Sequence, residues 1–347
     1  MHFLRKGMHW GAFVLMTGPT VSVAVPVYSV ARYIERCARS LFEQTYDALE
    51  FVFIDDASPD ESMEILNGLL SQYPARATAV KIVRHPVNRG LSAARNTALE
   101  HCTGEFITHV DSDDYLEPDA IEKLVALQAG TDADIVSGDF IRHNPDGEIL
   151  ETRPDYADRE QVLLDLTEQI HRHEIWGRLI RRSLYTEHHV GPEEGCNVGE
   201  DWQTLVPLVY YARTLAHLGE PVYHYNCTNP ASYMKQKWDK ATAEKIARQD
   251  FRSLEIVKEF VEDKDARLYS AIKHTGRDYA HGKMDRCVWE GERSLFRFYS
   301  RCLKADRDSY DRTPVSRFAD NWHLTYLLHY IVRLGLYKLR IIDSPTQ

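Results

Sequence analysis

Cysteine is scarce in this chain of 347 residues, and its six cysteines lie far apart in the sequence. None of them forms a Cys-x-x-C pair, which argues against a structural zinc site or a framework of disulfides. Reduced thiols are typical of a cytoplasmic protein, so we expect that location. The chain also lacks internal repeats and low-complexity tracts, which excludes a repeat architecture.

An excess of positive charge is lacking too. The formal net charge is −10, whereas a general nucleic-acid binder needs a basic surface, so we expect no nucleic-acid partner. The charge is uneven along the chain. Residues 286–347 contain 11 Lys/Arg and 7 Asp/Glu, a net of +4, so the preceding residues carry −14.

A hydrophobic run long enough to span a membrane is also absent. The nearest candidate, Trp322 to Ile342, is interrupted by histidines and basic side chains. Its apolar residues Leu324, Leu327, Leu328, Ile331 and Leu334 form one helical stripe. In a basic tail, such a stripe is compatible with peripheral docking on an anionic membrane. Packing on the rest of the chain or on a second subunit in a homodimer is the favoured interpretation of the stripe.

What the sequence does contain is a series of short apolar runs with helical patterns between them. The runs are residues 20–27, 49–54, 79–83, 105–110 and 133–137. Short buried strands that alternate with amphipathic helices indicate a mostly parallel sheet with helices on both faces. After about residue 235 the pattern is helical. The predicted fold class is therefore α/β with an α-helical C-terminal appendage.

The most informative motif is Asp111-Ser112-Asp113-Asp114, directly after one of these strands. In open α/β sheets, ligands bind beyond the carboxyl ends of the strands. A single Asp there needs no explanation beyond a helix cap. Three carboxylates in four residues repel one another, which favours a bound cation such as Mg²⁺ or Mn²⁺ shared with substrate phosphates.

Two further motifs fall at the same edge of the predicted sheet. Asp55 and Asp56 end the second strand, where a carboxylate could accept a hydrogen bond from a nucleobase or cap the following helix. The segment Asn88 to Asn96 opens a helix with Gly90 and Arg95. Helix N-termini and guanidinium groups bind phosphates, although an ordinary solvated helix start explains the segment equally well.

A last acidic pair, Glu200-Asp201, heads an apolar helical stretch. A carboxylate at this place could act as a general base that deprotonates an acceptor hydroxyl. Taken alone, the segment fits a helix-capping pair better.

Together these motifs resemble family 2 glycosyltransferases of the GT-A fold. The resemblance covers residues 20–230 and rests on Val25-Pro26-Val27-Tyr28, Asp55-Asp56-Ala57-Ser58, Asn88-x-Gly90, Ala94-Arg95-Asn96, Asp111 to Asp114 and Glu200-Asp201. It implies an inverting, metal-dependent transfer of one sugar from a nucleotide-diphosphate sugar, expected to be a UDP-sugar, to an acceptor hydroxyl. Bacterial surface-glycan synthesis, on a glycan or lipid-linked acceptor, is the expected setting.

The resemblance also assigns roles to residues. Asp201 would be the catalytic base, with Glu200 as the second candidate, and Asp113 and Asp111 would hold Mn²⁺ or Mg²⁺. Asp56 would contact the nucleobase. The remaining donor contacts would come from Pro26, Tyr28, Asn88, Arg95 and Asp111. Asp114 we expect to cap the next helix.

Some features depart from the family pattern. The chain has Ser29 where Asn is common, Ala57 where Gly is common, and Arg178 in place of the usual Lys after Trp176. Trp176 could face a sugar ring or be buried in the core. No Gln-x-x-Arg-Trp motif occurs, which by resemblance disfavours a processive synthase. A non-catalytic nucleotide-sugar-binding protein remains the main alternative, and a nucleotidyltransferase or phosphatase is a weaker one.

The expected domain organisation follows from these motifs. Residues 1–18 would be a leader of uncertain order, and residues 19–235 a catalytic domain. Within that domain, residues 19–140 would bind the donor and residues 141–235 would form the acceptor side. Residues 236–347 would form a helical C-terminal region, and the protein could contact the inner face of the membrane through the last helix.

Overall fold

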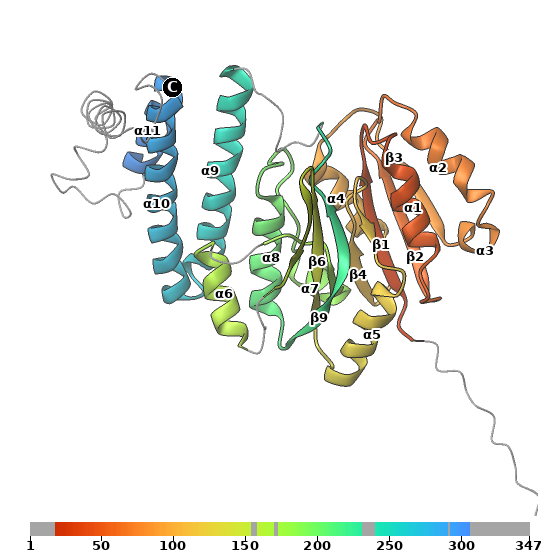
Figure 1. The fold of residues 1–347 in the computed structure, drawn as a ribbon. Coiled ribbons are helices and arrows are strands. Elements are labelled where there is room, and N and C mark those ends of the chain that lie inside the picture. Colours follow the sequence, from red (N-terminus) through yellow and green to blue (C-terminus); the bar gives the residue numbers. More distant parts are fainter. Residues whose placement is uncertain (1–17, 154–157, 170–172, 231–239, 291, 306–347) are drawn as a thin grey trace, which may run out of the picture.

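The computed structural model describes residues 18–153, 158–169, 173–230, 240–290 and 292–305 (Figure 1). The expected leader, apart from its last residue, and the apolar stripe between Trp322 and Ile342 lie outside these residues. Within the described ranges, no helix is long and apolar enough to cross a membrane.

One nine-stranded sheet forms the centre of the described chain, in the order β3-β2-β1-β4-β8-β6-β9-β5, with β7 paired to β6. The strands are β1 Val21–Val27, β2 Leu49–Asp55, β3 Val80–Arg84, β4 Phe106–His109, β5 Tyr115–Leu116, β6 Ile135–Asn144, β7 Gly147–Glu151, β8 Arg178–Arg181 and β9 Leu215–Asn226. All five predicted strands are present. The pairs among β3, β2, β1 and β4 are parallel, as is β6 with β9, whereas β8, β7 and β5 run antiparallel to their neighbours.

Both faces of the sheet are covered by helices, as the continuous apolar strands predict. Alternate residues of one strand enter different cores: Phe51 and Phe53 pack on one face, and Val52 and Ile54 on the other. The helices are α1 Ile34–Phe42, α2 Ser62–Leu70, α3 Pro74–Ala77, α4 Leu91–His101, α5 Ala120–Thr131, α6 Arg159–Thr167, α7 Arg182–His188, α8 Glu200–Tyr211, α9 Lys240–Glu262, α10 Ala266–Glu290 and α11 Arg293–Ala305. The predicted fold class is confirmed.

The C-terminal helices are part of the body of the molecule. Figure 1 shows α9 and α10 stacked outside α8 and α6, across the sheet from α1 and α2. Leu254, Val257 and Val261 of α9 share a buried cluster with Trp202 and Leu205 of α8. The expected boundary near residue 235 falls within 231–239, which lies outside the described residues, so the domain division stays a prediction.

Candidate active site

The carboxyl ends of β1, β2 and β4 meet at one edge of the sheet. Val27 pairs with Asp55, and Ala24 pairs with His109, so the segments that follow these strands start close together. Pro26 is buried within β1, whereas Tyr28, just beyond the strand, is 47% exposed. The Tyr28 ring is therefore available to a ligand, and donor contacts by Pro26 and Tyr28 stay predictions.

Asp56 anchors the turn that leads into α4. Its carboxylate accepts hydrogen bonds from the backbone N–H groups of Arg89 and Gly90, each at 2.8 Å, and lies 2.7 Å from Nδ1 of His85. The residue is only 3% exposed. Both carboxylate oxygens of Asp56 thus bind groups within the protein, and they stabilise the turn at Arg89 and Gly90. The direct contact of Asp56 with a nucleobase stays a prediction.

The turn itself requires glycine. Gly90 has φ +91°, and a Cβ there would lie 2.3 Å from the Asn197 side chain. A glycine allows this left-handed backbone and the close approach of the neighbouring loop. Asn88, two residues before Gly90, is exposed, so its side chain is accessible to a ligand and the donor contact by Asn88 stays a prediction.

Arg95 lies at the centre of the site. Its Nη2 is 3.1 Å from Oδ1 of Asp111, 3.2 Å from Oδ1 of Asp201 and 3.5 Å from Oε1 of Glu200, and the residue is 3% exposed. One guanidinium from α4 therefore joins the carboxylates that follow β4 to those that begin α8. The geometry places Nη2 of Arg95 among these carboxylates, while its buried Nε and Nη1 have no described hydrogen-bond partner. The expected contact of Arg95 with a diphosphate stays a prediction.

Burial and charge act against each other in this cluster. Burial lowers the pKa of Arg95, but Asp111, Asp201 and Glu200 more than compensate, so its pKa is raised and it stays charged. Burial raises the pKa of Asp201 well above the usual range, although the Arg95 charge opposes the shift. The pKa of Glu200 is raised in the same way. A carboxylate with a raised pKa is a better proton acceptor, which suits a general base.

The residues expected to hold a metal, Asp111 and Asp113, each use one carboxylate oxygen in a described contact. Oδ2 of Asp113 accepts a hydrogen bond from Nδ2 of Asn229 at 2.8 Å, and Oδ1 of Asp111 pairs with Arg95. Among the described hydrogen bonds and ion pairs, none uses the other carboxylate oxygen of Asp113 or Asp111. Burial raises the pKa of Asp113, and the Asp111 charge adds to the shift, so a cation here would stabilise both carboxylates.

No group of three or more His, Cys, Asp or Glu in the described part of the chain could hold a metal on its own. Mg²⁺ and Mn²⁺ do not need such a cage, because substrate phosphates and water supply the rest of their oxygen ligands. The pair of Asp111 and Asp113 therefore fits a metal that arrives with a phosphorylated substrate.

Asp114 does not cap the following helix. Its carboxylate is 1% exposed and accepts hydrogen bonds from the Tyr223 hydroxyl and the Asn226 backbone N–H, both at 2.7 Å. The N-cap position of α5 is Asp119. The Tyr223 hydroxyl also accepts the backbone N–H of Asp111 at 3.1 Å. Asp114 thus fixes the acidic segment to β9, an arrangement that no local sequence signal could have revealed.

A second set of contacts missed from the sequence holds the loop before Glu200 and Asp201. Asn197 accepts the backbone N–H of Ser92 at 3.0 Å, and its own N–H donates to Oε1 of Gln249 in α9 at 3.1 Å. Arg252 of α9 pairs with Glu193 at 2.8 Å. The candidate base is therefore positioned by both α4 and the C-terminal helices.

Trp176 is a packing residue. It is 2% exposed and stacks on Tyr223 with ring centroids 4.3 Å apart, while Phe140 meets it edge-on at 4.9 Å. Of the two alternatives for this residue, the structure shows burial in the core and not a surface that faces a sugar. By stacking on Tyr223, Trp176 supports the residue that holds Asp114 and Asp111.

Comparison with known sequences gives a consistent picture. The sequence model of glycosyl transferase family 2 matches residues 22–192. The chain is 33% identical over 218 residues to the putative glycosyltransferase EpsH of Bacillus subtilis, which covers 60% of this chain and 61% of EpsH. It is 30% identical over 238 residues to the uncharacterized glycosyltransferase EpsJ of the same organism, which covers 67% of each chain. The match thus spans about three fifths of EpsH.

Among solved structures, the fold is similar to that of the mannosyltransferase PcManGT from Pyrobaculum calidifontis in complex with GDP-Man and Mn²⁺. The TM-score is 0.55 at 22% sequence identity, with 93% of this chain and 82% of the other covered. At this identity the likeness concerns the fold, and it agrees with the GT-A fold expected from the sequence.

Proposed function

Because the chain belongs to glycosyl transferase family 2, and is thus a glycosyltransferase, we propose that it transfers a single sugar with inversion from a nucleotide-diphosphate sugar to an acceptor hydroxyl. The observation that carries this proposal is the Arg95 cluster. It places the candidate base Asp201 and the candidate metal ligand Asp111 on one guanidinium. A base and a metal site that lie on the same guanidinium are close enough to act on one substrate, as a displacement at an anomeric carbon requires.

In the proposed reaction, Asp201 accepts the proton of the acceptor hydroxyl while the hydroxyl oxygen forms a bond to the anomeric carbon. The bond from that carbon to the donor phosphate breaks, and the nucleoside diphosphate leaves with the electron pair. The raised pKa of Asp201 favours the proton transfer. When bound, a divalent metal would neutralise the charge that develops on the diphosphate.

The protein's other residues hold this arrangement. Asp111 and Asp113 would bind the metal. Arg95 opposes the rise in the pKa of Asp201 and holds its carboxylate in place, and Tyr223 fixes the acidic segment to β9. Glu200, 3.5 Å from Arg95, is the second candidate for the base. Tyr28 and Asn88 lie exposed at the same edge, where a nucleotide could contact them.

The donor is expected to be a UDP-sugar, but the solved structure of PcManGT contains GDP-Man, so both nucleotides belong in the test. For the acceptor, we propose a hydroxyl of a bacterial surface glycan or of its lipid-linked precursor, in the cytoplasm or at the inner face of the membrane. Relatives in Bacillus subtilis support a bacterial setting.

The decisive experiment is a thermal-shift screen of UDP, GDP and their sugars, with and without Mn²⁺, followed by an assay of donor hydrolysis in which water replaces the acceptor. A nucleotide at a hundred times its Kd should stabilise the protein by about 2.7 kcal/mol. The Asp113→Asn variant should lose the part of this stabilisation that depends on Mn²⁺. Asp146 is an exposed carboxylate in the β6–β7 turn, and the Asp146→Asn variant should behave as wild type.

Two outcomes would overturn the proposal. If neither nucleotide stabilises the protein in the presence of Mn²⁺, the chain does not use such a donor. If a nucleotide sugar binds but is neither hydrolysed nor transferred to any acceptor tested, the result favours a non-catalytic protein that binds nucleotide sugars.

A further inference from the structure

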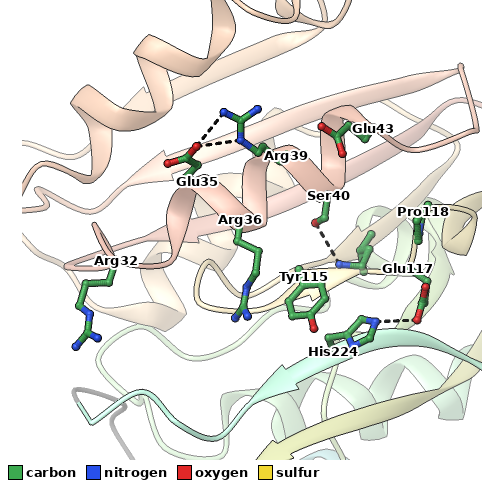
Figure 2. A pocket seen from close by; sticks show the side chains of 11 residues that line it. Arg32, Glu35, Arg36, Arg39, Ser40, Glu43, Tyr115, Glu117, Pro118 and His224 are labelled. Carbon is green, nitrogen blue, oxygen red and sulfur yellow. Dashed lines mark hydrogen bonds and ion pairs between the residues drawn. The ribbon is translucent and has the colours of Figure 1, made fainter.

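A groove runs along α1 on the side that faces β5 and β9 (Figure 2). Its volume is about 560 Å³. Arg36 and Arg39 line it from α1, and Arg32 lines it from the turn before that helix. Tyr115, Glu117 and His224 line it from the other side. We call this space the α1–β5 groove. It is separate from the Arg95 cluster, and the proposed transfer reaction makes no use of it.

Some charged side chains of the groove form ion pairs with one another, and two arginines do not. Arg39 pairs with Glu35 at 2.9 Å, and Glu117 pairs with His224 at 2.8 Å, so these side chains satisfy one another. Arg32 and Arg36 are both exposed. In the described part of the structure, neither has a carboxylate within ion-pairing distance. Two unpaired guanidinium groups one helical turn apart leave one end of the groove positively charged.

Arg36 is held in place for a ligand. Its guanidinium lies 4.2 Å from the centre of the Tyr115 ring, and the other face of that ring stacks on His224 at 4.1 Å. Nη2 of Arg36 also donates to the backbone carbonyl of Asp113 at 3.4 Å. The remaining N–H groups of the fork are free of described partners, and a planar fork is suited to two hydrogen bonds with a phosphate or carboxylate.

The groove meets the acidic segment at Arg36, whose guanidinium donates to the Asp113 backbone carbonyl. Arg32, in the turn before α1, and Glu43, at the C-cap of α1, both line the groove, which therefore extends along the nine residues of the helix, about 14 Å. A diphosphate bound at Asp111 and Asp113 could not fill such a length. A longer molecule that enters along the groove would reach the metal ligand with one end and contact Arg32 and Arg36 on the way.

We propose that Arg32 and Arg36 form a binding site for an oxyanion, a phosphate or a carboxylate, carried by the acceptor. The proposal rests on the proposed transfer function and adds the chemical class of its acceptor: an acidic glycan or a phosphate-bearing chain, in place of a neutral sugar. Charge-assisted hydrogen bonds from two guanidinium groups would retain such a chain while its hydroxyl is presented to the reaction centre.

Isothermal titration calorimetry on the full chain tests the site with glycerol 3-phosphate and glucuronate as anionic probes and glycerol and glucose as neutral ones. Titrations of metal-free protein without nucleotide, in a buffer from which the chelator has been removed, keep the metal site out of the measurement. Both anions should bind the wild type, and the double variant Arg32→Gln/Arg36→Gln should weaken binding at least tenfold. The neutral probes should not bind, and Arg297→Gln, an exposed arginine of α11, should change nothing.

An assay of donor hydrolysis shows whether the oxyanion that the two arginines bind belongs to the acceptor or to the donor. An unchanged KM for the nucleotide sugar in the double variant supports an acceptor site. A KM raised as much as the anion affinity falls would place the arginines in the donor site and overturn the proposal, as would wild-type protein that binds neither anion. Failure of the proposed function is a different result, because it appears as the lack of nucleotide binding in the thermal-shift screen.

Discussion

The Arg95 guanidinium lies 3.2 Å from the Asp201 carboxylate and 3.1 Å from that of Asp111. These two carboxylates are ninety residues apart in sequence and belong to different elements, α8 and the segment after β4. One buried cation therefore couples the proposed base to the proposed metal site. Any change at Arg95 should affect both.

Replacing Arg95 with glutamine should disable the site and destabilise the fold. Removal of one partner from a buried ion pair costs about 3 kcal/mol or more, because the carboxylates remain buried without a counterion. We expect a loss of about that size in urea unfolding and a fall in donor hydrolysis of about a hundredfold.

The Arg95→Lys variant separates charge from geometry. A lysine keeps the positive charge, but its flexible side chain lacks the planar guanidinium that holds Nη2 among the three carboxylates, so it should recover stability better than it recovers hydrolysis. Wild-type kcat in the Arg95→Gln variant would show that Arg95 does not position the reacting groups.

The pH dependence of hydrolysis should reveal Asp201. Burial raises its pKa well above the range of an ordinary aspartate, about 3.9, even though Arg95 opposes the shift. A base works only when deprotonated, so kcat should fall as the pH drops through this raised pKa and reach its plateau above it.

Variants of Asp201 and Glu200 identify the group whose protonation causes this fall of kcat at low pH, the acidic limb of the pH profile. Asp201→Asn should bind the nucleotide with wild-type affinity and lose the limb together with most of the rate, whereas Glu200→Gln should keep both. If the two variants exchange these behaviours, Glu200 is the base.

Tyr223 should be important for stability and for metal-dependent binding. Its hydroxyl donates to the buried Asp114 carboxylate and accepts the backbone N–H of Asp111. The Tyr223→Phe variant leaves a buried carboxylate short of a donor, which should cost about 1–3 kcal/mol. With the acidic segment less constrained, the affinity for nucleotide in Mn²⁺ should fall several-fold.

Tyr225→Phe is a matched control, because its ring also stacks near Trp176 while no described hydrogen bond uses its hydroxyl. Equal unfolding free energies for the two variants would contradict the role assigned to the Tyr223 hydroxyl.

The elements of the fold could be predicted from sequence because their signals are local. Apolar runs gave the five strands, and the turn between Asn144 and Gly147 joins β6 to β7 as a hairpin. The antiparallel insertion of β8 between β4 and β6 could not be predicted, since strand order depends on pairing between distant segments. The acidic motifs could be assigned to one sheet edge from the sequence because they directly follow the predicted strands.

The roles within the site depended on contacts that the sequence does not reveal. The segment around Arg95 suggests a phosphate ligand because it opens a helix, and only the fold shows that Nη2 of Arg95 also lies beside Asp111, Glu200 and Asp201. Asp114 looked like a cap, but its partners on β9 lie 109 and 112 residues away. Electrostatic pairing over such separations leaves no periodic pattern in a single sequence.

The helical C-terminal region should influence the reaction through Asn197. Asn197 lies two positions before the N-cap of α8. Its side chain accepts a hydrogen bond from the Ser92 N–H at the start of α4, and its backbone N–H donates to the side chain of Gln249 in α9. Replacing Asn197 with alanine removes the first contact and leaves the Ser92 N–H without its partner. The expected cost is about 1 kcal/mol of unfolding free energy.

Because Asp201 lies in the first turn of α8, a looser loop should also lower kcat several-fold, while the acidic limb of the pH profile stays in place since the base itself is intact. Asn67→Ala, at an exposed asparagine in α2, should change neither quantity. A shift of the limb in the Asn197→Ala variant would mean that the loop controls the environment of Asp201 as well as its position. Unchanged kcat would show that α4 and the C-terminal helices do not position the base through this residue.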